Sequence, residues 1–167
     1  RRCRVYTRTR VVETVLKPPN YYDEEYYRRG QQTGRSCYQD YRWMPETSLR
    51  LAMALIDLAS IPRESPVLDF GCALGYLVKA LRLLFRDAYG VDHSEWAVAN
   101  ADPAVRDYIR VVHEGYTWPF EHIAFHTVIA KDVLEHLTRE QVEIVLLRLR
   151  RMSQQLGVLV PVGDGEK

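Results

Sequence analysis

The chain has 167 residues and a formal net charge of +1, with 47% hydrophobic and 27% charged residues. This composition is typical of one globular domain and excludes a mostly disordered chain, a collagen-like chain and a coiled coil. No apolar run approaches the roughly 18 residues that a membrane-spanning helix needs. The three cysteines are far apart and form neither a disulfide framework nor a metal knuckle, so we expect a cytoplasmic protein without a metal site.

Charge divides the chain into two regions. Residues 1–45 contain ten basic and five acidic residues and are rich in tyrosine, whereas residues 46–167 carry a net charge of −4. We therefore expect a basic, Tyr-rich arm over 1–45 and a main domain over 46–167. Such an arm is typical of a solvated segment, and the alternative interpretation is a lid or a docking surface for an anionic partner.

The helices of the main domain are predicted from spacing and caps. Apolar residues at helical spacing predict helices over about 46–60 and over 74–84. Ser94 is placed to cap a short helix, and Thr138 with Gln141 forms a capping box at the start of another. Polar residues 31–40, before the first of these helices, predict a loop.

Short apolar runs between these helices predict strands. They cover 67–70, 88–91, 108–112, 124–130 and 156–162, and a run over 4–16 rich in Val, Thr and Tyr predicts one more. Strands that alternate with helices indicate an α/β fold with a mostly parallel sheet. Right-handed crossovers place the carboxyl ends of such strands at one edge, where open sheets bind ligands.

The first strand of the main domain runs into a turn of small residues over 71–75. Small side chains let a ligand approach the backbone, and the start of the next helix offers free N–H groups. Tyr76 stands where a dinucleotide fingerprint has its third glycine, and the chain has no Gly-Lys-Ser/Thr phosphate loop. Asp69 adds a carboxylate that repels a pyrophosphate and attracts an ammonium group.

Asp92 ends the second strand of the main domain. An acid at this position can accept hydrogen bonds from both hydroxyls of a ribose. Bonds of this charge-assisted kind contribute about 1.5–3 kcal/mol each. The alternative is a carboxylate that caps the next helix, because Ser94 and Glu95 follow, and the glycine turn favours the ribose role.

Three segments resemble the motifs of class I S-adenosylmethionine-dependent methyltransferases. They are 67–75, 90–92 and Asp132-Val133-Leu134-Glu135-His136-Leu137. The resemblance covers roughly 46–162 and implies a Rossmann-like α/β fold, a mostly parallel sheet flanked by helices. The family's sheet has seven strands, so we expect the last two to be lacking here, either because the chain is a fragment or because the final hairpin is absent.

The resemblance also implies S-adenosylmethionine (SAM) as cofactor, with S-adenosylhomocysteine (SAH) as product. It places the methionine part of the cofactor against the turn, the ribose on Asp92 and the adenosine beside His93. The other cofactor-binding residues that it implies are Asp69, Gly71, Cys72, Ala73 and Gly75 in the turn, Glu114 and Gly115 at the adenine, Lys131 and Asp132 at the pocket's end, Arg50 near the carboxylate, and Tyr22.

His136 is the candidate general base, because its motif position is near the acceptor and histidine titrates near neutral pH. The alternative is a packing or helix-capping histidine. The tyrosines at 21, 22, 26 and 27 are candidates for an aromatic lid over the sulfonium, where a cation–π contact contributes about 0.5–2 kcal/mol. Packing of an ordinary N-terminal helix explains them equally well.

Three functions remain open from the sequence. The first is a methyltransferase that acts on a small-molecule or metabolite-like acceptor, since the signatures of nucleic-acid base and ribose methylation are absent. The second is an RNA or protein methyltransferase that holds its substrate with the arm, where arginines and tyrosines interleave. The third is a non-catalytic scaffold that retains the fold.

Overall fold

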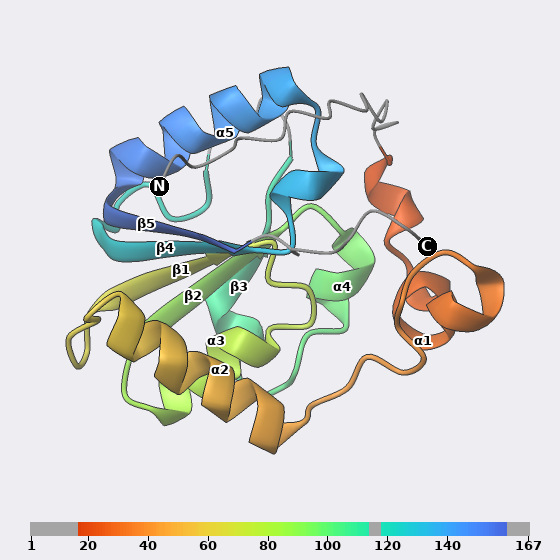
Figure 1. Ribbon diagram of the computed structural model, residues 1–167, viewed down its shortest axis with the longest axis horizontal. Coiled ribbons are helices and arrows are strands. Elements are labelled where there is room, and N and C mark those ends of the chain that lie inside the picture. The colour runs from red at the N-terminus through yellow and green to blue at the C-terminus, as the bar shows by residue number, and fades with distance from the viewer. Residues whose placement is uncertain (1–16, 114–117, 160–167) are drawn as a thin grey trace, which may run out of the picture.

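The computed structural model describes residues 17–113 and 118–159, so the strand predicted over 4–16 lies outside the described residues. The described strands form one parallel sheet in the order β3-β2-β1-β4-β5 (Figure 1). They are β1 (Pro66–Phe70), β2 (Asp87–Asp92), β3 (Ile109–Val111), β4 (Phe125–Lys131) and β5 (Ser153–Leu159). The predicted α/β class and parallel sheet are confirmed, with five strands among the described residues rather than seven.

The helices cover both faces of the sheet. In Figure 1, α2 and α3 lie on one face and α5 lies on the other. The α-helices are α1 (Glu24–Thr33), α2 (Pro45–Leu58), α3 (Tyr76–Leu83), α4 (Glu95–Ala99) and α5 (Arg139–Met152). Three 3-10 turns accompany them, η1 (Pro19–Tyr21), η2 (Arg106–Tyr108) and η3 (Leu134–His136).

Most predicted boundaries hold to within a few residues. Of the three differences described next, the first two are explained by a glycine with a left-handed φ. The helix predicted from residue 74 begins at Tyr76, because Gly75 adopts a left-handed φ of 81°. Residues 31–33, expected in a loop, form the last turn of α1, which ends at Gly34 with a φ of 69°. Strand β5 begins at Ser153, directly after α5.

The hydrophobic core has one layer on each side of the sheet. On one side, Ala52 of α2 and Leu81 of α3 are fully buried against Val67 of β1. On the other side, Leu149 of α5 is fully buried against Val128 of β4. Burial of apolar area on both faces explains why the strands read as short apolar runs rather than as alternating ones.

The predicted caps are present. The Ser94 side chain accepts a hydrogen bond from the Ala97 N–H at the start of α4. Thr138 and Gln141 form the reciprocal capping box of α5. These local bonds satisfy amides that have no partner within the helix, and they hold each helix start near the edge of the sheet.

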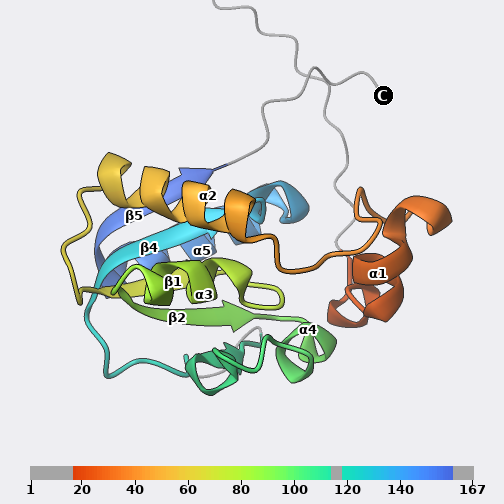
Figure 2. The same cartoon turned by 90° about the horizontal axis from the view of Figure 1, so that it is seen from below.

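The chain order places a topological switch point between β1 and β4, since successive strands run outward from it in opposite directions. Figure 2 shows α1 beyond the carboxyl ends of the strands, next to α4. The described part of the arm, residues 17–45, thus covers the sheet edge where ligands are expected. None of the described helices is long and apolar enough to cross a membrane.

Candidate functional site

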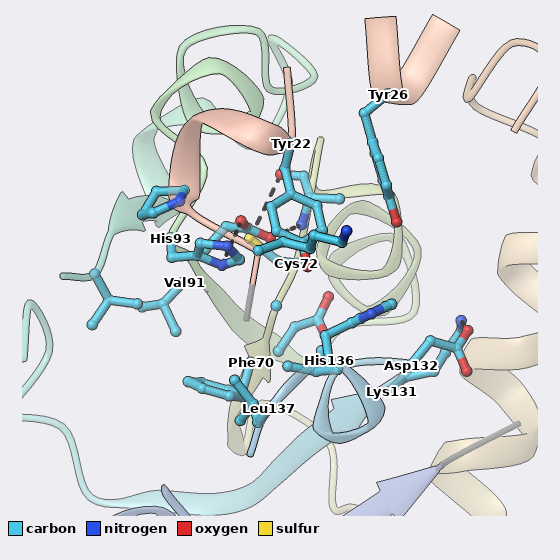
Figure 3. Close-up of a pocket in the computed structure, with 18 of the residues that line it drawn as sticks. Tyr22, Tyr26, Phe70, Cys72, Val91, His93, Lys131, Asp132, His136 and Leu137 are labelled. Atoms are coloured by element: carbon cyan, nitrogen blue, oxygen red, sulfur yellow. Dashed lines mark hydrogen bonds and ion pairs between the residues drawn. The ribbon is translucent and has the colours of Figure 1, made fainter. Parts of the chain in front are cut away.

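A cavity of about 690 Å³ opens at the carboxyl edge of the sheet. Its volume lies in the range of ligand pockets, about 300–1,000 Å³. The wall combines the β1–α3 turn, the ends of β2 and β4, the η3 turn and the arm (Figure 3). Ten predicted site residues line it: Tyr22, Asp69, Gly71, Cys72, Ala73, Asp92, His93, Lys131, Asp132 and His136.

The other four predicted residues are not on the described wall. Gly75 starts α3, and a Cβ there would come within 2.2 Å of Ile109 Cδ1, so its visible role is close packing. Arg50 lies on the exposed side of α2, where its Nε donates to the Glu46 carbonyl at 2.9 Å. The remaining two, 114 and 115, lie outside the described residues. The role predicted for Arg50 stays a prediction.

Backbone geometry shapes the β1–α3 turn. Gly71 has a φ of +83°, and a Cβ there would lie 2.2 Å from Val133 Cγ2. Ala73 also adopts a left-handed φ, of 50°, although it carries a methyl group. The N–H groups of Gly71 and Cys72 donate to the Val91 carbonyl at 2.8 and 3.1 Å. The turn is thereby tied to β2 and leaves its inner side open to a ligand.

Asp92 receives two of the amides that hold this region together. Its Oδ2 accepts from the Ala73 N–H at 2.8 Å, and its Oδ1 accepts from the Ser94 N–H at 2.8 Å. The capping interpretation is therefore visible in the structure, but it uses only part of the carboxylate. An ionised carboxylate has about four acceptor sites, and the amides of Ala73, Ser94 and His93 act on this one, which leaves room for a hydroxyl donor from the cavity.

Burial shifts the pKa of two acids near the carboxyl ends of β1 and β2, Asp69 and Asp92. Burial raises the pKa of Asp92, while His93 and the two amide bonds lower it. Burial raises the pKa of Asp69 to about 7, although the Lys131 charge opposes this rise. Asp69 is 4% exposed and has no ion pair among the described residues. A buried acid of this kind is stabilised in its charged form by a cationic ligand group.

Trp118 provides an unpaired donor on the same wall. The side chain is 7% exposed and its ring stacks on Phe70 at 5.7 Å. Its Nε1–H has no hydrogen-bond partner among the described residues. A buried donor without a partner is costly, by about 1–3 kcal/mol, which a ligand acceptor atom would offset. Sequence reasoning missed this donor, and the only signal was an indole in the loop before β4.

The end of β4 brings the last predicted residues together. Asp132 adopts a left-handed φ of 54°, and its N–H donates to the Leu159 carbonyl of β5 at 2.9 Å. Lys131 Nζ donates to the Asp132 carboxylate. His136 follows in η3, and Figure 3 shows its ring below Tyr22 and beside Asp132. The described residues contain no cluster that could hold a metal ion.

The arm closes the cavity with aromatic rings. Tyr22 is 7% exposed, and its ring centroid lies 4.7 Å from that of His93 and 6.0 Å from that of His136. Its carbonyl accepts a hydrogen bond from the Ser94 hydroxyl. Tyr41 packs on Tyr76 at 5.2 Å. The tyrosine that replaces a fingerprint glycine is thus a docking point for the arm.

Comparison with protein-family models decides the family. The model of the methyltransferase domain matches residues 68–160, more than half of the chain. The chain belongs to this methyltransferase domain family. The matched range includes the turn, Asp92 and the segment 132–137, so the predicted resemblance is confirmed.

Solved structures give the same fold at low identity. Magnesium protoporphyrin IX methyltransferase from Synechocystis PCC 6803, solved with bound SAH, is 19% identical with a TM-score of 0.60, over 83% of this chain and 68% of that one. A methyltransferase of an antibiotic biosynthesis pathway from Anabaena variabilis is 21% identical with a TM-score of 0.54, over 66% and 45%. This chain therefore spans less than half of the Anabaena protein's length. The search of curated proteins found no match.

Proposed function

We propose that this methyltransferase-family chain binds SAM and transfers its methyl group to a small-molecule acceptor. The observation that carries the proposal is Asp92, which is buried at the end of β2, holds the β1–α3 turn by the Ala73 amide, and keeps acceptor sites toward the cavity. The Synechocystis methyltransferase, whose structure was solved with bound SAH, is 19% identical to this chain. This likeness supports the same cofactor here.

The residues on the wall fit the parts of this cofactor. Asp92 would accept from the ribose hydroxyls, and the unpaired Trp118 Nε1–H would donate to an acceptor nitrogen of the adenine. Asp69 would face the ammonium group. Gly71 lines the cavity, and its lack of a side chain lets Val133 pack against the turn. When bound, SAM supplies a methyl group on a sulfonium, which is already activated for displacement.

The task left to the protein is therefore to orient the acceptor and to exclude water, which lowers the barrier by several kcal/mol. Tyr22 and the rest of the arm cover the cavity and perform the exclusion. His136 is the group placed to take a proton from the acceptor, since it lines the cavity opposite Tyr22. Its role as general base is part of the proposal.

Within the described part of the arm, residues 17–45, the ion pairs favour a small acceptor over RNA. The described acids of the arm are all in ion pairs with arginines of the arm itself: Glu24 with Arg28, Asp23 and Glu25 with Arg35, and Asp40 with Arg42. Three of the arginines are thereby neutralised locally, whereas phosphate binding needs uncompensated cations. We also propose a reducing, cytoplasmic setting, in which Cys37 and Cys72 stay free thiols.

Calorimetric titration with SAM and SAH tests the proposal. We expect micromolar binding by the wild type and a loss of about tenfold or more in Asp92→Asn, which removes the charge from the ribose contacts. Asp102→Asn is the matched control, because Asp102 is a largely buried, ion-paired carboxylate outside the cavity. Circular dichroism verifies that each variant folds. A folded wild type that binds neither ligand would overturn the proposed cofactor and with it the activity.

A further inference from the structure

The half of the cavity wall that comes from the arm is built mainly of tyrosines. Tyr22, Tyr26 and Tyr38 all line the cavity. The ring of Tyr26 lies 4.9 Å from Tyr22 at 66° and 5.8 Å from Tyr38 at 73°. Rings at such angles form walls that face in different directions. In Figure 3, Tyr22 and Tyr26 lie above the cavity, and His136 and Asp132 lie below it.

Tyr27 also lines the cavity, but its ring is more enclosed than those of Tyr26 and Tyr38. Tyr27 is 4% exposed and is stacked between Tyr38 and Trp96, at 6.1 and 5.6 Å. Both of its faces are therefore covered by protein. Tyr26 and Tyr38 remain partly exposed and lie on the cavity, so their rings are available to a ligand.

The phenols stay neutral, which preserves the negative faces of their rings. Burial raises the pKa of Tyr22 to about 12, and the charges of Asp92 and Glu135 add to this rise. Burial likewise raises the pKa of Tyr38 to about 12, with contributions from Asp132 and Glu135. The charges of Asp132 and Glu135 thus act on the Tyr38 phenol, and both residues line the same cavity.

Two of the cations on the cavity wall are paired with acids, whereas Lys17, which also lines the cavity, lies over the Tyr21 ring at 4.9 Å and has no ion pair among the described residues. Arg35 is held by Asp23 and Glu25, with N–O distances of 3.0 and 2.9 Å. Lys131 is paired with Asp132. Glu135, which also lines the cavity, has no ion-pair partner among the described residues. Glu135 therefore adds an exposed carboxylate to this wall that no described cation pairs with.

We propose that Tyr22, Tyr26, Tyr38 and Glu135 form a subsite for a positively charged amine of the methyl acceptor. Aromatic faces attract an ammonium group by about 0.5–2 kcal/mol each, and the carboxylate adds charge complementarity. As an acceptor subsite, it rests on the proposed function, in which SAM occupies the part of the cavity beside Asp92.

Titration of the SAH-saturated protein with choline tests the subsite, because SAH carries no sulfonium charge to compete for the rings. The reference ligand is dimethylbutanol, the neutral isostere in which carbon replaces the nitrogen of choline. We expect choline to bind about tenfold more tightly, since that is the effect of roughly 1.4 kcal/mol of charge-dependent attraction. Dimethylbutanoate, the anionic isostere, should show no binding.

Variants assign the effect to the named residues. Glu135→Gln should reduce the preference for choline about fivefold, and Tyr26→Leu should abolish most of it. Tyr26→Phe keeps the ring and should preserve the preference. Glu140→Gln replaces an exposed carboxylate in the first turn of α5 by a neutral carboxamide. This variant is the control for surface charge and should leave the preference for choline unchanged.

The outcomes separate the subsite from the proposed function. Equal binding of choline and its neutral isostere overturns the subsite and leaves SAM binding untouched, because SAH affinity is measured independently. Tighter binding of the neutral ligand also overturns it and indicates an apolar acceptor. If SAH does not bind, the same ligand pair is titrated into the protein alone, where the rings and Glu135 predict the same preference.

Discussion

The β1–α3 turn and the arm face the same cavity but are held in place by different forces. In the turn, amides of Gly71, Cys72 and Ala73 donate to Val91 and Asp92, so backbone bonds define the shape. In the arm, ring contacts such as Tyr41 on Tyr76 attach the segment, while its described ion pairs are internal. The turn is thus a rigid part of the sheet edge, and the arm is a separate layer docked on it.

Two aspartates show the same difference electrostatically. Burial raises the pKa of Asp69 in the turn to about 7. For Asp23 in the arm, burial also raises the pKa, but the Tyr26 amide and the Arg35 guanidinium outweigh it, so the pKa lies below its usual value. The turn holds its acid ready for a cationic ligand, whereas the arm uses its acid to stabilise its own helix start.

The largest expected effect comes from a methyl group added to each region. Gly71→Ala should lower the free energy of unfolding by about 3 kcal/mol, because the left-handed backbone is strained and the Cβ would lie 2.2 Å from Val133 Cγ2. Gly34 in the arm also has a positive φ, but nothing lies within 4 Å of an added Cβ. Gly34→Ala should therefore lower the free energy of unfolding by only about 1 kcal/mol. Urea denaturation measures both, and equal losses would contradict a turn that is more tightly constrained than the arm.

The pH dependence of stability should have opposite signs for the two aspartates. Native Asp69 binds a proton up to about pH 7 that the unfolded chain releases near pH 4, so wild type should gain stability relative to Asp69→Asn as pH falls through this window. The expected slope is at most about 1.4 kcal/mol for each pH unit. Asp23 has a lowered pKa, so its contribution is present above about pH 4 and is lost as pH falls further.

Denaturation of wild type, Asp69→Asn and Asp23→Asn between about pH 3 and pH 8 makes this comparison. The effect of Asp23 should be the smaller one, because its side chain is 41% exposed and solvent screens its charge. Parallel curves for wild type and Asp69→Asn would show that Asp69 titrates normally and is not the buried acid that the turn implies.

The smallest effect tests the hydrogen bond by which Ser94 of the main domain holds the arm. Ser94 caps α4 and donates to the Tyr22 carbonyl, so Ser94→Ala should cost about 1 kcal/mol and speed hydrogen exchange at the arm amides. Thr138→Ala removes a comparable cap from α5, away from the arm. It should cost a similar free energy without faster exchange in the arm. Identical exchange in both variants would mean that Ser94 does not hold the arm.

Local patterns in the sequence were sufficient for much of the domain. The strand runs of the main domain, the helical spacing, the Ser94 cap and the Thr138 box depend on residues at most a few positions apart, and they are present among the described residues. The placement of Asp69 and Asp92 at one edge follows from parallel strands, whose carboxyl ends meet there. Their roles toward a cofactor stay predictions until binding is measured.

The sequence by itself determined the α/β class, the glycine turn and the family resemblance, because these are encoded in short segments with their own spacing. Only the tertiary structure decided that the arm covers the cavity, that Tyr76 anchors it and that the Trp118 N–H has no partner among the described residues. Such contacts join residues far apart in the chain, as Tyr22 and Ser94 are, 72 positions from each other. No local pattern specifies them, since they arise only when the folded sheet brings its edge, its turns and the arm together.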